Sequence, residues 1–243
     1  MAHATFRAAE IIERIAEQPM SVVDLAEEFD VHRSSMFRQL KALEQVGYVR
    51  RRDDARFVVG AKLIALARLS FDDVDLRRAG YEHVRSLHDK VGHTIQSVGL
   101  IGDSLIYVDK VQAASGVGMY SRVGAEAPAY CSGVGKVILA GLDPYRRNAI
   151  LDSTTWHRFT PNTFTTRLQL DEAIEKAAER GWAVDDRELD MMINCLAVPI
   201  SRPSGVVGAV SVTAVSNVEN INALMKYLPL LQDTARAIEG ELG

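Results

Sequence analysis

The strongest constraint on the fold is a helical pattern that occurs three times within the first sixty residues of the chain. Apolar residues recur at intervals of three and four positions in 8–15, 22–29 and 36–43, which is the spacing of one buried helix face. Only Asp30 and Val31 separate the second predicted helix from the start of the third, in which Met36, Leu40 and Leu43 point inward. Two helices joined by so short a turn are typical of a helix-turn-helix. We therefore predict a small three-helix unit in this part of the chain.

Charge is distributed unevenly along this unit. Residues 1–30 hold two basic and seven acidic side chains, whereas residues 31–52 hold six basic side chains and one acidic one. The net charge of the 243-residue chain is −4, which on its own argues against a nucleic-acid partner. A concentrated positive stripe nevertheless attracts phosphates locally, whatever the total charge. An isolated run of charge is usually a solvated helix face, but this run coincides with the third helical pattern.

The segment after the third helical pattern predicts a wing. Gly47 is a natural helix stop, and the runs 48–52 and 56–59 flank Asp53 and Asp54 as the two strands of a hairpin would. Helix-turn-helix units read duplex DNA, and Arg, Lys and Ser side chains suit contacts with bases and phosphates. The predicted DNA-contacting residues are Arg33, Ser34, Ser35, Phe37, Arg38, Lys41, Arg50, Arg51, Arg52 and Arg56. The alternative is a helical unit used for protein contact without DNA.

Residues 61–73 are predicted to form a linker helix with hardly any polar face. Apolar residues dominate 63–69, and a helix that is apolar all round must be buried. The simplest cover is a second copy of the chain, because two winged helices can then read two half-sites. We therefore predict a homodimer or homotetramer.

Residues 74–243 alternate helical and strand patterns, which predicts an α/β domain. Helices are expected at 76–90, 132–142, 168–180 and 217–242, and strands at 93–100, 104–111, 182–185, 196–200 and 206–214. The predicted fold class is α+β, with a winged helix-turn-helix at 1–60, a linker helix at 61–73 and a larger domain at 74–243.

Motifs of the common enzyme classes do not occur in the chain. It contains no P-loop, no G-x-G-x-x-G and no H-E-x-x-H motif, and its six histidines are scattered, so no cofactor and no metal are expected. Cys131 and Cys195 are too few to staple a chain of this size, which favours a reducing, cytoplasmic compartment. Charged residues interrupt the most apolar stretches, so neither a signal peptide nor a membrane span is expected.

Six motifs occur in order along residues 122–213 of the chain. The motifs are R-V-G at 122–124, P-A-Y-C-S-G-V-G-K-V-I-L-A at 128–140, F-T-P-N-T-F-T at 159–165, G-W-A-V-D-D-R-E at 181–188, C-L-A-V-P-I at 195–200 and G-A-V-S-V-T at 208–213. Each motif is weak alone, but their order and spacing together are fairly specific. Together with the winged helix and the linker helix, these motifs resemble the IclR family of bacterial transcription regulators, and the resemblance covers nearly the whole chain.

The resemblance implies a dimer, often a tetramer, that binds promoter DNA through its N-terminal domain, with repression as the expected outcome. It also implies that the C-terminal domain, similar to the GAF fold, binds a small effector, commonly an organic acid. Carried over to this chain, the effector-binding residues are Gly133, Val134, Asp185, Ile193, Cys195, Ser211 and Thr213. The physical chemistry agrees, because the first turn of a helix offers free N–H donors and a favourable dipole to an anion.

One departure from the family pattern concerns the ligand. The family usually has a glycine three residues before Cys195, whereas this chain has Met192. Bulky apolar groups there favour a larger or more apolar effector, such as an aromatic acid. The alternative function is an enzyme that acts on a small carboxylic acid with Cys195 as nucleophile and an autoregulatory winged helix. That alternative lacks a histidine placed to activate the thiol.

Overall fold

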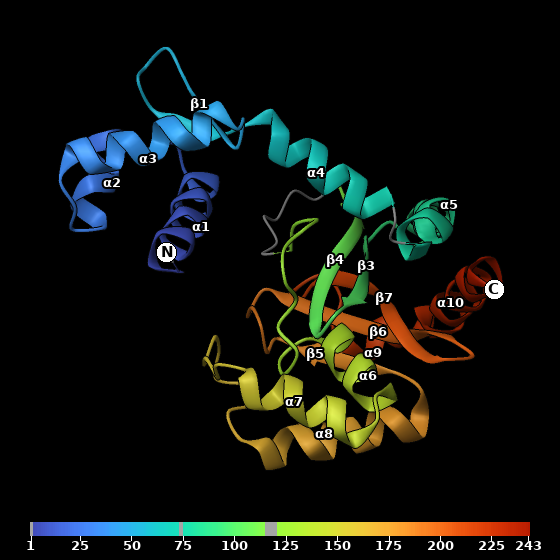
Figure 1. Ribbon diagram of the computed structural model, residues 1–243. Coiled ribbons are helices and arrows are strands. Elements are labelled where there is room, and N and C mark those ends of the chain that lie inside the picture. Colours follow the sequence, from blue (N-terminus) through green and yellow to red (C-terminus); the bar gives the residue numbers. More distant parts are fainter. Residues whose placement is uncertain (1, 73–74, 115–120) are drawn as a thin grey trace. The chain divides into compact units, whose positions relative to one another are not determined.

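The computed structural model describes residues 2–72, 75–114 and 121–243 of the chain (Figure 1). The chain divides into two compact units, Met1–Asp73 and Val74–Gly243, and each has an apolar core of its own. The side chains of residues 68–72 lie outside the description, and Leu69 of the predicted linker helix is one of them. The helices within the described ranges are all too short or too polar to cross a membrane.

The N-terminal unit consists of helices and a two-stranded hairpin. Its elements are α1 (Ala2–Glu17), α2 (Val22–Glu28), α3 (Arg33–Gln45), β1 (Val49–Arg51), β2 (Phe57–Val59) and α4 (Ala61–Asp72). The helical spacing in the sequence buries one face of each of the first three helices, so that Ile11, Leu25 and Met36 are fully enclosed. Phe57 of β2 is also fully buried and joins the hairpin to this core.

Local signals set the turns of the winged helix. The Ser21 hydroxyl accepts the Asp24 N–H at 3.2 Å, and the Asp24 carboxylate accepts the Ser21 N–H at 2.9 Å, which is a capping box at the start of α2. Between α2 and α3, Asp30 adopts a φ of 48°, a conformation that Asp tolerates better than most residues. Strands β1 and β2 pair antiparallel with Val49 opposite Val59.

Helix α4 leaves its apolar residues open to solvent in the described chain. Ile64 is 61% exposed and Leu66 is 38% exposed, while Leu63 is half-buried. The apolar helix predicted from the sequence is therefore present, but the chain itself does not bury these side chains.

The C-terminal unit is built on an antiparallel sheet of five strands in the order β4-β3-β7-β6-β5. The strands are β3 (Thr94–Ile101), β4 (Ser104–Val111), β5 (Ala183–Asp186), β6 (Ile193–Arg202) and β7 (Gly205–Val215). The helices are α5 (Asp75–Val91), α6 (Gly133–Gly141), α7 (Pro144–Ser153), α8 (Arg167–Arg180), α9 (Ile221–Leu224) and α10 (Leu228–Leu242), with a 3₁₀ turn at Met225–Tyr227. The helical N-terminal unit and this helix-covered sheet confirm the predicted α+β class.

Helices cover both faces of the sheet (Figure 1). Helix α5 contacts β3 and β4, and α10 contacts β6, β7 and α5. Against the other face, α6 contacts β5, β6 and β7, and α8 packs on α6. Because of this double cover, β3, β6 and β7 are buried along most of their length. Polar side chains that are buried on these strands are therefore expected to have a hydrogen-bond partner or a functional role.

Two helical regions differ from the sequence prediction. The single helix predicted at 217–242 is broken into α9, the 3₁₀ turn and α10. Asn220 caps α9. Pro229 lies in the first turn of α10, where a backbone N–H would have no acceptor within the helix, so proline costs no hydrogen bond there.

The periodicity also fails to predict α7, whose start is set by Asp143. The Asp143 carboxylate accepts two backbone N–H groups of that helix, each at 3.0 Å.

Candidate functional site

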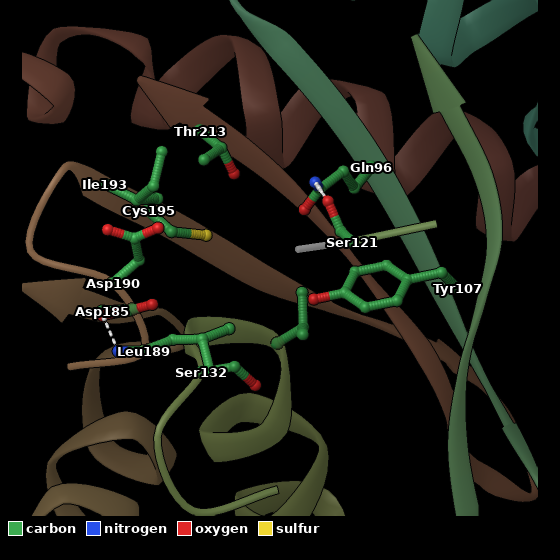
Figure 2. A pocket seen from close by; sticks show the side chains of 11 residues that line it. Gln96, Tyr107, Ser121, Ser132, Asp185, Leu189, Asp190, Ile193, Cys195 and Thr213 are labelled. Carbon is green, nitrogen blue, oxygen red and sulfur yellow. Dashed lines mark hydrogen bonds between the residues drawn. The ribbon is translucent and has the colours of Figure 1, made fainter. Parts of the chain in front are cut away.

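A small cavity lies beside the sheet and the first turn of α6 in the C-terminal unit (Figure 2). Its volume is about 40 Å³, which is room for a few water molecules. The described residues that line it are Gln96, Tyr107, Ser121, Ser132, Val134, Asp185, Leu189, Asp190, Ile193, Cys195 and Thr213. Most of them are polar although the surrounding sheet is buried, so the cavity is a candidate ligand site.

Asp185 of β5 supplies a buried carboxyl group to this cavity. The residue is 3% exposed, and its Oδ1 accepts the backbone N–H groups of Glu188 at 2.7 Å and of Leu189 at 3.4 Å. These bonds hold the turn that follows β5 and fix the carboxyl group in the cavity wall (Figure 2). Burial, followed by the nearby Glu188 carboxylate, raises the pKa of Asp185 to about 7 against the opposing effect of Lys136.

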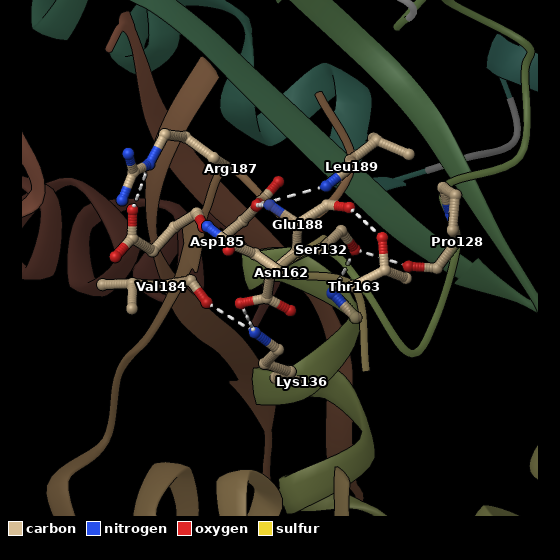
Figure 3. A network of polar contacts seen from close by, with 12 residues as sticks. Pro128, Ser132, Lys136, Asn162, Thr163, Val184, Asp185, Arg187, Glu188 and Leu189 are labelled. Atoms are coloured by element: carbon tan, nitrogen blue, oxygen red, sulfur yellow. Dashed lines mark hydrogen bonds and ion pairs between the residues drawn. The ribbon is translucent and has the colours of Figure 1, made fainter. Parts of the chain in front are cut away.

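Lys136 of α6 is paired with Glu188 close to the cavity (Figure 3). The lysine side chain is 3% exposed, and its ammonium group forms an ion pair with the Glu188 carboxylate and donates to the Val184 carbonyl at 2.7 Å. The ammonium also lies 4.7 Å from the centre of the Phe164 ring, a cation–π distance. Burial nevertheless raises the pKa of Glu188. With Asp185, the cluster contains two carboxyl groups and one ammonium.

Hydroxyl and thiol groups line the sheet side of the cavity. Cys195 of β6 lies opposite Thr213 of β7, and the buried Thr213 Oγ1 has no hydrogen-bond partner among the described residues. The Tyr107 hydroxyl points into the cavity (Figure 2), and burial raises its pKa, so it remains a proton donor. Burial raises the pKa of the Cys195 thiol to about 12, which keeps the thiol neutral at ordinary pH.

The first turn of α6 faces the same cavity. Ser132 caps the helix, since its hydroxyl accepts the Gly135 N–H at 3.0 Å and donates to a backbone carbonyl at 2.6 Å. The N–H groups of Gly133 and Val134 precede the first helical hydrogen bond, so the helix itself offers them no acceptor. A Cβ at Gly133 would lie 3.3 Å from the Ala197 Cβ. Glycine at this position therefore lets α6 pack closely on β6.

Five of the predicted effector-binding residues line the cavity, namely Val134, Asp185, Ile193, Cys195 and Thr213. Gly133 and Ser211 are not in its wall, and Ser211 is fully buried with its hydroxyl unpartnered among the described residues. Sequence reasoning missed Gln96, Tyr107, Ser121, Ser132, Leu189 and Asp190. A polar residue inside an apolar strand, such as Gln96 in β3, is a sequence signal that could have predicted part of this site. The Gln96 side-chain amide donates to the Ser121 hydroxyl.

The adjacent methionines point away from this site. Met191 and Met192 are each 47% exposed, and neither lines the cavity. Met192, from which a larger or more apolar effector is expected, therefore lies outside the wall of this cavity, and the size of the effector stays a prediction.

The N-terminal unit presents a separate basic surface on α3 and the hairpin. Of the predicted DNA-contacting residues, Ser35 is half-buried and the others are exposed, including the Phe37 ring at 41%. Some of these cations have nearby carboxylates, as in Lys41–Glu44 at 2.7 Å, Arg52–Asp54 at 3.7 Å and Arg33–Glu27 at 3.8 Å. Among the described residues, Arg38 and Arg50 have no acidic partner.

A winged helix-turn-helix joined to a sheet domain with an internal polar cavity is the organisation of a transcriptional regulator with a sensory domain. Two family descriptions match the chain, the IclR helix-turn-helix domain over residues 4–53 and the bacterial transcriptional regulator IclR C-terminal domain over residues 69–240. The chain belongs to the IclR family of bacterial transcriptional regulators.

Named relatives match over nearly the full length. The transcriptional regulator KdgR of Escherichia coli K12 is 28% identical over 93% of this chain and 87% of its own length. The crystal structure of Thermotoga maritima IclR covers 100% of both chains with 29% identity and a TM-score of 0.81. An IclR homologue from Microbacterium hydrocarbonoxydans, crystallised with 4-hydroxybenzoate, is 22% identical over 98% of both chains with a TM-score of 0.84, a likeness of fold.

Proposed function

We propose that this chain is a transcriptional repressor whose binding to promoter DNA is controlled by a small organic acid. The observation that carries the proposal is the cavity at the first turn of α6, whose lining includes the hydroxyl-bearing residues Tyr107 and Thr213 and the carboxyl group of Asp185. Backbone N–H groups of the helix and neutral hydroxyls are suitable donors to the carboxylate of a ligand. Repression is the expected outcome because a protein on a promoter excludes polymerase without needing any contact with it.

The DNA-binding part of the proposal rests on α3 and the hairpin. Arg38 and Lys41 are exposed one turn apart on α3, opposite the buried Met36 and Leu40, as a helix in the major groove requires. Exposed wing arginines such as Arg50 suit contacts with the phosphate backbone. Selection from random duplexes, followed by sequencing, should enrich one sequence. Affinity for it should fall steeply with salt concentration, and failure to enrich any sequence would contradict the assignment.

We propose that α4 forms a homodimer or homotetramer interface. Its Ile64 and Leu66 side chains are exposed on a helix with little polar surface, and burial of such residues favours association. Light scattering of the wild type should give the mass of a dimer or tetramer, and Ile64→Glu should lower that mass. A monomer at micromolar concentration would rule the interface out. A cytoplasmic location follows from the proposed promoter target.

The effector would act by favouring one spacing of the two winged helices through α4. Such control requires the ligand to bind one arrangement better than the other. Titration of small carboxylates, 4-hydroxybenzoate among them, into the complex with the selected duplex should release the DNA. In vitro transcription from the same duplex separates repression from activation. If an acid binds the protein and neither DNA affinity nor transcription changes, the regulatory role of the cavity is wrong.

An enzyme with Cys195 as nucleophile is the competing function. The cavity does not favour it, because burial raises the pKa of the Cys195 thiol to about 12 and the described lining residues include no histidine. A thiol activated for attack needs a lowered pKa or an adjacent base. Mass spectrometry of the acid after prolonged incubation should therefore recover it unchanged.

A further inference from the structure

The cavity holds negative but no positive side-chain charge. Its described lining residues include the carboxyl groups of Asp185 and Asp190 but no Lys, Arg or His. An anionic ligand would thus enter a site in which helix dipole and hydroxyl donors are opposed by carboxylate charge.

The titratable groups around Asp185 come from several elements. Lys136 of α6 is the nearby cation, but its ammonium is already bound to the Glu188 carboxylate and the Val184 carbonyl. Glu188 itself lies in the turn after β5 and adds negative charge next to Asp185. The remaining neighbours are Asp190 of the same turn, the Tyr107 hydroxyl of β4, and the thiols of Cys195 on β6 and Cys131 before α6. Lys136 therefore still opposes the protonation of Asp185, but its ammonium already has partners, and the Lys110 ammonium of β4 donates to the carbonyl of the lining residue Ser121 at 2.8 Å.

Backbone hydrogen bonds engage one oxygen of the Asp185 carboxyl group; they favour its ionised form, and burial outweighs them. Its Oδ1 already accepts two backbone N–H groups, from Glu188 and Leu189, and this use of one oxygen leaves Oδ2 as the atom able to carry a proton. A protonated carboxyl group donates one hydrogen bond and still accepts at its other oxygen. Protonation therefore keeps both existing bonds and turns a repelling charge into a donor.

We propose that the cavity binds an organic acid together with one proton, which resides on Asp185 and is donated in a hydrogen bond to the ligand carboxylate. The inference rests on the proposed acid effector and specifies its chemistry. One bound proton offsets the charge of one carboxylate, and the described lining residues, which also include Asp190, contain no Lys, Arg or His to offset a second. The ligand class we infer is therefore the compact monocarboxylate. No covalent bond forms or breaks, because the carboxylate and the proton enter from solvent and leave to it.

Burial raises the pKa of Asp185 to about 7, which sets the pH range of the effect. Carboxylic acid ligands are fully ionised above about pH 6, so a change in affinity above this pH reports on the protein. The protonated fraction of Asp185 falls about tenfold from about pH 6 to about pH 8. The affinity for a monocarboxylate should fall by the same factor.

The experiment is calorimetric titration of the full-length protein with glycolate and with 4-hydroxybenzoate, each paired with its neutral amide. For an acid that binds, the affinity should be about tenfold weaker at about pH 8 than at about pH 6. Buffers of different ionisation enthalpy should show uptake of about one proton at the higher pH. This proton count is measured on the wild type and needs no variant.

Two variants assign the proton to its residue. Asp185→Asn keeps an oxygen for the two backbone N–H groups and cannot titrate, so it should abolish both the pH dependence and the proton uptake. Asp186→Asn is the matched control, because Asp186 lies next in β5, pairs with Arg187 and does not line the cavity. It should behave as the wild type does.

Three results would overturn the inference in distinguishable ways. Equal affinity of the wild type for an acid at both pH values would reject the proton linkage while leaving the acid effector intact. A pH dependence that survives in Asp185→Asn would reject the assignment to this residue. If neither acid binds at about pH 6, the acid effector of the proposed function is wrong and the inference falls with it.

Discussion

The two units of the molecule place their charged groups in opposite environments. On α3 and the hairpin, the basic side chains are exposed and keep their hydration, so they stabilise the fold little and remain available to phosphates. At the cavity, Asp185, Glu188 and Lys136 are each at most 4% exposed. Buried charges interact strongly with each other and with protons. Under the proposed function, the basic side chains of α3 and the hairpin act on DNA, whereas Asp185, Glu188 and Lys136 act on stability and ligand binding.

The largest effect is expected from removing the buried cation. Lys136→Met should lower the free energy of unfolding of the C-terminal unit by about 3–5 kcal/mol, because it leaves the Glu188 carboxylate buried without its partner. Both tryptophans, Trp156 and Trp182, lie in this unit, so urea unfolding followed by tryptophan fluorescence reports on it alone. The exposed Lys176 of α8 provides the control variant Lys176→Met. Equal stability of the two variants would contradict the strong buried interaction.

The next effect is a dependence of stability on pH. Folding raises the pKa of Asp185 from 3.8 to about 7, so between these values the folded state binds more protons than the unfolded state. The free energy of unfolding therefore falls as pH rises through this range. Above the range, the total decrease due to Asp185 is about 4 kcal/mol. Carboxylates with lowered pKa act in the other direction, so the quantity to measure is the difference between wild type and Asp185→Asn. A constant difference from about pH 4 to about pH 8 would be incompatible with a raised pKa.

A smaller effect is expected at the DNA-binding surface. Arg38→Ala should weaken binding to the selected duplex by about 1–3 kcal/mol if the guanidinium contacts a base. The free energy of unfolding should hardly change, because the side chain is exposed. Fluorescence anisotropy of the labelled duplex measures the first quantity, and Arg236→Ala on the exposed surface of α10 is the control. Undiminished affinity of Arg38→Ala would remove this residue from the interface.

The smallest effect concerns an exposed ion pair. Lys41 pairs with Glu44 at 2.7 Å, with side chains 48% and 28% exposed, and such pairs add little to stability. Lys41→Met should change the free energy of unfolding by less than about 0.5 kcal/mol, while reducing the slope of DNA affinity against salt by about one. An effect on stability as large as that of Lys136→Met would abolish the contrast between the two units.

Much of the fold was predictable because local patterns carry it. The apolar spacing on α1 to α3 and the capping box at Ser21 are set by neighbours in sequence, as is the hairpin around residues 53–55. The apolar runs of β6 and β7 likewise predict buried strands. Helix α7 escaped prediction because its weak periodicity does not distinguish it from a loop, although Asp143 and Pro144 mark its start.

The cavity was predictable only in part, because its wall joins segments that are distant in sequence. The resemblance to a family supplied Asp185, Cys195 and Thr213, and the structure places them together. Gln96 of β3 and Tyr107 of β4 line the cavity because β3 lies between β4 and β7 in the sheet. The apolar spacing within one segment does not predict the order of the strands. The position of Met192 depends on the turn before β6, so the sequence alone does not show whether its side chain lines the cavity; it is 47% exposed and does not.

The strand order also has a consequence for how the protein is made. Residue Thr94 of β3 pairs with Thr213 of β7, so the sheet cannot close until nearly the whole polypeptide has left the ribosome. The N-terminal unit needs nothing beyond residue 73 for its core. We expect the nascent chain to acquire a folded winged helix while the cavity is still unmade. If the proposed function holds, the capacity to engage a promoter therefore arises during synthesis before the capacity to be released from it.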